Sequence, residues 1–141
     1  MSHTVELTTL LATLEPELLD NEMVFCSFPG AIVDDKLFLC SSGFFMEREG
    51  ITLIVRKVDA ERYVALFDTV LRQITLNVHS TLEAVGLTAA VATRLAQHGI
   101  SANVVAAYYH DHIFVPASDA KRALQALRAL QADAAARGNE S

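Results

Sequence analysis

Apolar residues recur at helical spacing at the start of the chain and again in its second half. Over residues 5–14 the leucines fall three and four positions apart, which predicts a helix. That helix should end before Pro16, because a residue that precedes proline disfavours helical backbone. The same spacing runs over residues 87–98 and stops at Gly99, a residue suited to the left-handed end of a helix.

Two more helices are expected from capping residues followed by apolar stripes. Asp59 can accept hydrogen bonds at the start of a helix, and the apolar residues after it share one face: Ala60, Val64, Phe67 and Leu71. Ser118 can cap a last helix in the same way, with an apolar stripe at Ala120, Leu124, Leu127 and Leu130. Residues from Ala132 onward are small and polar, so this tail is expected to fray.

Short segments rich in β-branched, aromatic and other apolar residues predict strands. They span residues 23–28, 36–40, 51–55, 74–78, 101–109 and 113–115. Pro29 and Gly30 end the first segment at a turn. The last two segments form a hairpin that turns at His110 and Asp111.

The second half of the chain therefore has the order strand, helix, strand, strand, helix. This is a ferredoxin-like order that lacks only its last strand. The first half begins on a helix, so the two halves can complete one another or pair through a dimer. The expected fold is α+β, with two ferredoxin-like units whose antiparallel sheets carry helices on one face. The expected boundaries are residues 1–71, residues 72–132 and a flexible tail over residues 133–141.

Charge and composition narrow the classes of function. The chain has 17 acidic and 11 basic side chains among 141 residues, a formal net charge of −6. No segment concentrates lysine and arginine, which argues against a nucleic-acid binder and against contact with an anionic membrane. The sequence has no basic leader and no apolar run of about 20 residues. We therefore expect a cytoplasmic protein with no nucleic-acid and no membrane partner.

The loop that opens the helix at Leu87 is the most informative candidate for binding. Its glycine, Gly86, lets a ligand approach the backbone, and the free N–H groups at a helix start favour a carboxylate or a phosphate. A tight turn alone would also explain this glycine. Asn103, early in the next strand, can both donate to and accept from an ammonium or amide group of a ligand. An asparagine at a sheet edge can equally bond to nearby backbone.

Histidine and serine side chains offer weaker signals. His79, His110 and His112 carry nitrogen atoms that bind zinc, yet an HxH pair falls short of a full ligand set. We therefore predict no metal site. His79 and Ser80 are neighbours in the chain and can form a nucleophile–base pair only if a turn folds them together.

The cysteines and a carboxylate pair complete the candidates. Cys26 and Cys40 do not form a CxxC motif, and we expect reduced thiols that behave as small apolar side chains; a bridge between them remains the alternative. Glu47 and Glu49 precede a strong strand. Paired carboxylates can perform acid–base chemistry, but a solvated pair is the commoner arrangement at such a place. We predict no catalytic residue.

The stretch from Ile74 to Pro116 resembles ACT domains, the small ligand-binding units attached to enzymes of amino-acid metabolism. The whole chain, over roughly residues 5–131, resembles stand-alone bacterial tandem ACT proteins. Two segments carry this second likeness: Glu47-Arg48-Glu49-Gly50-Ile51-Thr52-Leu53-Ile54 and His79-Ser80-Thr81-Leu82-Glu83-Ala84-Val85-Gly86-Leu87-Thr88-Ala89-Ala90. The second half of the chain is similar to the regulatory domains of aspartate kinases and to cytosolic arginine sensors.

The resemblance implies a ligand site and no catalysis. In aspartate kinases the ligand lies against the loop after the first strand, the start of the first helix and the start of the second strand. The matching positions are Ala84, Val85, Gly86, Leu87, Thr88, Ser101, Ala102 and Asn103. Aspartate kinases that resemble this chain can carry an aspartate at the position of Asn103, and an amide cannot neutralise a ligand ammonium.

The resemblance also implies a regulatory role. We expect a sensor that binds a small molecule, an amino acid by resemblance, and that uses no cofactor. It would act as a homodimer or on an unknown protein partner. The alternative function is an oligomerisation or protein-interaction scaffold without a small ligand.

Overall fold

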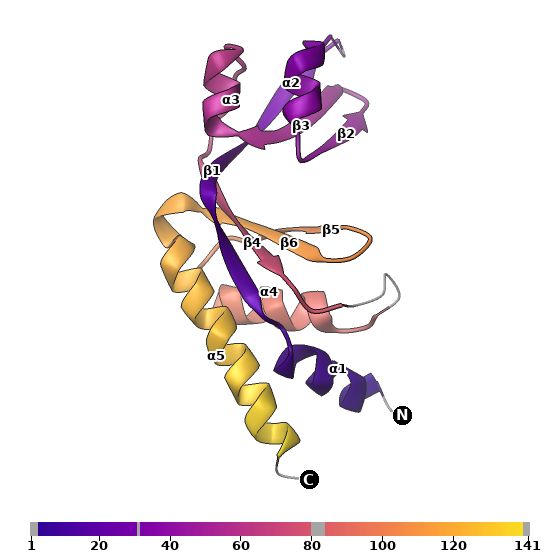
Figure 1. The fold of residues 1–141 in the computed structure, drawn as a ribbon, viewed down its shortest axis with the longest axis vertical. Coiled ribbons are helices and arrows are strands. Elements are labelled where there is room, and N and C mark those ends of the chain that lie inside the picture. Colours follow the sequence, from indigo (N-terminus) through magenta and orange to yellow (C-terminus); the bar gives the residue numbers. More distant parts are fainter. Residues whose placement is uncertain (1–2, 31, 80–83, 140–141) are drawn as a thin grey trace. The chain divides into compact units, whose positions relative to one another are not determined.

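Backbone contacts divide the chain into two compact units, which can be followed along the chain by colour in Figure 1. The structure is a computed structural model and describes residues 3–30, 32–79 and 84–139. Unit 1 comprises residues 1–19 and 73–141, and unit 2 comprises residues 20–72. The expected division after residue 71 follows the order of the sequence, whereas these units group the N-terminal segment with the second half of the chain.

Unit 1 has the element order that its sequence predicts, together with a strand from the N-terminal segment. Its elements after that segment are β4 (Leu71–Leu76), α4 (Leu87–Gln97), β5 (Asn103–Ala106), β6 (Asp111–Pro116) and α5 (Ala120–Gly138). The start of β1 (Pro16–Pro29) belongs to this unit, and its strands follow the order β1-β4-β6-β5. β1 thus supplies the strand that the second half of the sequence lacks, and the ferredoxin-like unit is complete.

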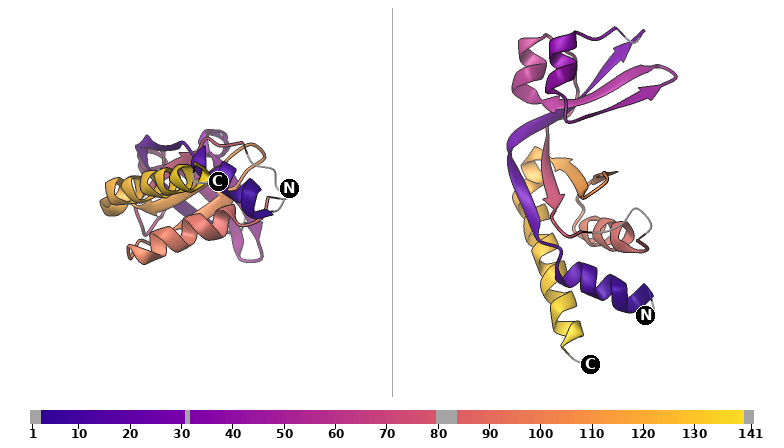
Figure 2. Two further views of the ribbon diagram at one scale, coloured as in Figure 1. Left: turned by 90° about the horizontal axis from the view of Figure 1, so that it is seen from below. Right: turned by 45° about the vertical axis from the view of Figure 1, so that its right-hand side comes forward.

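The core of unit 1 joins one face of its sheet to the helices α1 (His3–Ala12), α4 and α5. It is supplied by alternate strand positions and by one stripe of each helix, as their periodicities require. Its residues include Leu11, Ile74, Leu76, Leu87, Val91, Leu95, Ile113, Val115, Leu127 and Ala134. α5 contacts both α1 and α4, and the three helices can be traced in Figure 2. The helices therefore share one face of the sheet with this core.

Unit 2 repeats the ferredoxin-like order with shorter helices. It contains the rest of β1, α2 (Asp35–Cys40), β2 (Gly43–Glu47), β3 (Gly50–Arg56), α3 (Lys57–Arg62) and the beginning of β4. β3 pairs antiparallel with β1 on one side and with β2 on the other. Its core contains Val24, Cys26, Leu37, Leu53, Val55 and Ala60. The strand residues that alternate with these therefore point to the face that this core does not use.

The strand expected over residues 36–40 is wrong, because this segment forms α2. Asp34 caps the helix: its carboxylate accepts hydrogen bonds from the backbone N–H groups of Lys36 at 2.8 Å and Leu37 at 3.4 Å. Leu37 is the buried residue of the helix. A local cap thus outweighs the strand preference of a short apolar run.

The helix expected after Asp59 is shorter and begins earlier. α3 starts at Lys57 and ends at Arg62, and Val64 follows with a left-handed φ of 55° that stops the helix. Asp59 lies inside the first turn, where its buried carboxylate pairs with the Arg56 guanidinium at 2.9 Å. The expected cap is therefore an ion-paired residue of the helix.

The end of the chain differs from expectation in two respects. Ser118 lies in a 3₁₀ turn, η1 (Ala117–Asp119), and makes no side-chain cap. The helix α5 continues to Gly138, so fraying from Ala132 is wrong; Ala134 is completely buried in the core. Among the described residues no helix has the length and hydropathy needed to cross a membrane.

Candidate functional site

The helix start at Gly86 has the backbone geometry that a ligand loop would need. Gly86 adopts a left-handed φ of 95° immediately before α4, and its carbonyl accepts the first helical hydrogen bond from the Ala90 N–H at 2.9 Å. A Cβ atom at this position would meet Leu7 Cδ2 of α1 at 3.0 Å. Only glycine combines this φ with such a close neighbour at little cost. The first N–H groups of α4 have no intrahelical partners.

A hollow of about 450 Å³ borders this glycine in unit 1. Its apolar lining comes from Leu7 and Leu11 of α1, from Ala89 and Ala90 of α4, and from Leu130 of α5. Its polar lining comes from Thr93, Arg94, Gln97 and Arg137. The hollow thus combines an aliphatic wall with two guanidinium groups.

The two arginines of this hollow differ in their partners. Arg94 donates to the Asp133 carboxylate at 2.9 Å, and its side chain is 21% exposed. The Arg137 guanidinium has no hydrogen bond or ion pair within the described ranges 3–30, 32–79 and 84–139. Arg137 is therefore the cation that remains available to an anionic ligand.

The structure separates the predicted site residues into two groups. Ala84, Val85 and Thr88 are exposed around Gly86, while Leu87 is buried in the core of unit 1. Ser101, Ala102 and Asn103 follow the other end of α4, where the Ile100 N–H still bonds to the Leu95 carbonyl at 3.0 Å. A helix of 11 residues is about 16 Å long. The two groups thus lie at opposite ends of α4 within one chain.

Asn103 begins β5 opposite Phe114 of β6, and its exposed side chain donates to the Phe114 carbonyl at 3.4 Å. This is the sheet-edge arrangement that the sequence leaves open. Val105 lies opposite His112 on the same face, because residues two apart in a strand point the same way. Asn103 and His112 therefore share the face of the sheet that lies away from the core.

His112 is held on that face by a buried polar pair from β4. The Gln73 amide nitrogen donates to the Thr75 hydroxyl at 3.1 Å. His112 Nδ1 lies 3.2 Å from the Gln73 amide nitrogen and 3.0 Å from the Thr75 hydroxyl oxygen. Burial lowers the pKa of His112, and the neighbouring His110 lowers it further.

The pKa of the adjacent Asp111 carboxyl shifts in the opposite direction, and burial is again the main cause. Burial raises the pKa of Asp111, against the opposing influence of His112 and His110. His110 Nδ1 lies 3.4 Å from the Val78 carbonyl, and its ring meets that of His79 edge to face at 5.2 Å. The described residues contain no group of three or more His, Cys, Asp or Glu side chains arranged to hold a metal ion. Ser80, the predicted neighbour of His79, lies outside the described residues, as do residues 81–83.

The cysteines do not form a disulfide. Cys26 is buried in the core of unit 2, where burial raises the pKa of its thiol, and Cys40 is exposed at the end of α2. A buried thiol with a raised pKa is a poor nucleophile. Both side chains are therefore free thiols, as the spacing led us to expect.

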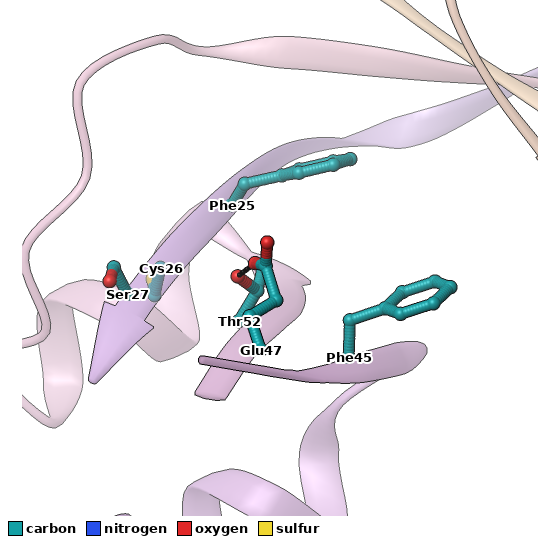
Figure 3. Close-up of a pocket in the computed structure, with 6 residues that line it drawn as sticks. All are labelled: Phe25, Cys26, Ser27, Phe45, Glu47 and Thr52. Carbon is teal, nitrogen blue, oxygen red and sulfur yellow. Dashed lines mark hydrogen bonds between the residues drawn. The ribbon is translucent and has the colours of Figure 1, made fainter. Parts of the chain in front are cut away.

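A second hollow, of about 420 Å³, lies on the sheet of unit 2 (Figure 3). Its lining comes from β1, β2 and β3: Phe25, Cys26, Ser27, Phe45, Glu47 and Thr52. Figure 3 shows Glu47 and Thr52 joined by a hydrogen bond between the strands, in which the Thr52 hydroxyl donates to Glu47 Oε1 at 2.6 Å. This hollow is aromatic and carries a carboxylate, whereas the hollow of unit 1 is aliphatic and carries arginines.

Sequence reasoning misses most residues of both hollows. Arg94 and Arg137 lie on different helices, and their spacing in the sequence does not indicate that they line the same hollow. Phe25 lies in an expected strand, Phe45 lies in a segment for which the sequence predicts no element, and Glu47 is weighed only as an acid–base candidate beside Glu49. A sequence signal is the apolar run Phe44-Phe45-Met46. The structure places this run on the edge strand β2, where Phe45 and Met46 are exposed at 65% and 75%.

Comparisons with known proteins agree with this architecture. Two models of the ACT domain match residues 4–72 and 69–129. The chain is similar to a solved protein of unknown function from Vibrio cholerae, described as a possible transport protein, with 48% identity, a TM-score of 0.81 and coverage of 92% of this chain and 99% of that one. No curated protein matches.

More distant solved structures share the fold alone. A protein from Agrobacterium tumefaciens has 12% identity and a TM-score of 0.68, with 82% of this chain and 87% of that chain covered. The regulatory subunit of aspartate kinase from Thermus flavus has 12% identity and a TM-score of 0.58, with 82% and 95% covered.

Proposed function

This chain belongs to the ACT domain family, and we propose that it is a non-enzymatic regulatory module that binds an amino acid. The observation that supports this most is Gly86, whose left-handed backbone starts α4 beside a hollow that has an aliphatic wall and Arg137, an arginine without an ion pair among the described residues. A helix start and a guanidinium both favour a carboxylate. The aliphatic wall favours an apolar side chain.

The binding residues in this proposal are those that the sequence indicates. Residues 84–88 would hold the ligand carboxylate at the start of α4, with Arg137 nearby. Because Ser101, Ala102 and Asn103 follow the other end of α4, we propose that they meet the ligand from a second copy of the chain. A homodimer would then bind the ligand between its copies, and ligand binding would shift its assembly or its contact with a partner.

We propose that the boundary between the two sequence repeats lies after residue 71. Residues 1–71 and 72–132 are two ACT-type sequence repeats, and the segment before residue 20 completes the second of them by supplying the start of β1. An exchange of this kind joins the two repeats through the chain itself. A ligand that orders one repeat could then change the stability of the other.

A scaffold without a ligand is the second candidate, favoured by the edge strand β2. Its residues Phe44, Phe45 and Met46 are 49%, 65% and 75% exposed, and β2 is the first strand in the sheet order. An apolar edge strand is a template for pairing with another chain. A scaffold would keep its assembly whether or not a metabolite is present.

Thermal-shift screening of the full chain with the common amino acids tests the two candidates. We expect one amino acid to raise the Tm, because a ligand that binds only the folded state stabilises it. Arg137→Ala should abolish that rise and Arg137→Lys should retain part of it. A flat response to every amino acid, together with an unchanged oligomeric state by light scattering, would favour the scaffold.

A further inference from the structure

The hollow of unit 2 is built on one face of its strands. Ser27 of β1, Thr52 of β3 and Phe45 of β2 lie directly opposite one another in the antiparallel register. Residues two apart in a strand share a face, so Phe25 and Glu47 join them. This face is opposite to the one that packs Cys26 and Leu53 into the core.

The side chains of this face give the hollow an aromatic and an anionic part. Figure 3 shows the ring of Phe25 from β1 and the ring of Phe45 from β2 near the Glu47–Thr52 pair. Phe45 is 65% exposed, so much of its apolar ring faces solvent. Glu47 is the charged residue among the described lining, and its Oε1 accepts from Thr52. Its second carboxylate oxygen remains able to accept from a ligand.

This combination has a definite chemical complement. A primary ammonium can donate to the Glu47 carboxylate and to the hydroxyl oxygens of Thr52 and Ser27, because it has several N–H donors and these oxygens have free lone pairs. Aromatic rings attract a neighbouring cation and cover an apolar body. A carboxylate would find no cationic side chain in the described lining and would be repelled by Glu47.

We propose that this hollow, formed by Phe25, Phe45, Ser27, Thr52 and Glu47, binds a primary amine that carries an aromatic or aliphatic body and no carboxylate. The site is separate in residues and opposite in charge preference from the amino-acid site of unit 1, and it stands whether or not that function is correct. The negative charge of Glu47 determines the ligand class. Glu47→Gln tests this, because the amide removes the charge and keeps the shape of the side chain.

Calorimetric titration of the full chain with 2-phenylethylamine tests the site. The matched probes are 3-phenylpropionate, which reverses the charge, and 2-phenylethanol, which removes it. We expect the amine to bind at least about tenfold more tightly than the carboxylate. Equal binding of amine and carboxylate would overturn the proposal, because it would show apolar adsorption without charge recognition.

Variants assign the effect to the hollow. Glu47→Gln should weaken amine binding about five- to tenfold and leave the alcohol unchanged, whereas Phe45→Ala should weaken both. Glu49→Gln is the matched control, since Glu49 is an exposed carboxylate two residues away that does not line the hollow. Amine binding that survives Glu47→Gln at full strength would contradict the proposal, provided that thermal melts show a folded variant. Failure of every amino acid to bind would leave this result untouched.

Discussion

The two units share an element order but place their exposed chemistry on different layers. In unit 1 the hollow lies among helices, with Arg94 and Arg137 beside an aliphatic wall. In unit 2 the hollow lies on the sheet, and Glu47 lines it together with Phe25 and Phe45. The same fold thus presents a hollow lined by arginines in one unit and a hollow lined by a carboxylate in the other.

The two hollows differ in chemistry because one lies among the helices of its unit and the other lies on the sheet of its unit. Unit 1 has the additional helix α1, which packs against α4 and α5 and creates a groove between helices. The described residues of unit 2 form the short helices α2 and α3, and its edge strand β2 carries apolar residues to the surface. The chemistry of each hollow therefore depends on the surface residues that line it and not on the architecture that the two units share.

Truncating a core leucine gives the largest expected effect and tests whether the units are separate in stability. Leu127 in unit 1 and Leu53 in unit 2 are both completely buried. Leu127→Ala and Leu53→Ala should each cost about 2–5 kcal/mol of unfolding free energy, because a cavity remains. Hydrogen exchange should show the greater loss of protection in the unit that carries the change. Equal loss throughout both units for either variant would contradict this division.

Replacing Gly86 at the start of α4 should give the second-largest loss of stability, and it tests the proposed site of unit 1. Gly86→Ala should cost about 1–2 kcal/mol, because an alanine is strained at this φ and its Cβ would press on Leu7. Gly99→Ala is the matched control: Gly99 has a φ of 69° and open space around its Cβ position. Chemical denaturation should show similar losses for both, whereas only Gly86→Ala should reduce amino-acid binding. Equal binding by both variants would remove Gly86 from the site.

Periodicity predicts the second half of the chain better than the first. α4, its end at Gly99 and the β5–β6 hairpin follow from apolar spacing and from glycine, since each has a local cause in the sequence. In the first half, α2 depends on the cap by Asp34, and β2 escapes prediction because Phe44, Phe45 and Met46 do not alternate with polar residues.

The candidate site is predictable only in part, for a similar reason. The Gly86 loop has a local signature, because its glycine precedes a clear helix. The two hollows are lined by residues that come from different helices or strands. The spacing of these residues along the sequence does not indicate that they lie close together in the fold. The separation of Asn103 from Gly86 likewise depends on the course of α4.

The polar pair around His112 predicts a pH effect in unit 1. Burial places the pKa of His112 below its usual 6.5. The unfolded chain therefore binds the proton first as the pH falls, and the folded state loses stability from about pH 6.5 downward through the lowered pKa. Urea unfolding at pH 7.5 and 5.5 should show this loss, and His112→Gln should reduce it. Asp111 acts in the opposite direction at lower pH, because its raised pKa favours the folded state there. A pH slope that persists undiminished in His112→Gln would contradict the assignment.

The surface pair between Arg94 and Asp133 gives the smallest expected effect. Asp133→Ala should cost less than about 1 kcal/mol, since the carboxylate is largely exposed. The change also frees the Arg94 guanidinium beside the hollow, so amino-acid binding should become a few-fold tighter by calorimetry. Weaker binding in this variant would indicate that the pair positions Arg94 for the ligand.

Amide chemical-shift mapping of the full chain, titrated with the amino acid that most raises its Tm, locates the amino-acid site on the molecule. We expect the amides of residues 84–88 to shift on binding and those of residues 101–103 to shift with them, while the amides around Thr52 and Glu47 stay in place. Shifts confined to unit 2, or no shift with any amino acid, would contradict the assignment of an amino-acid site to the start of α4.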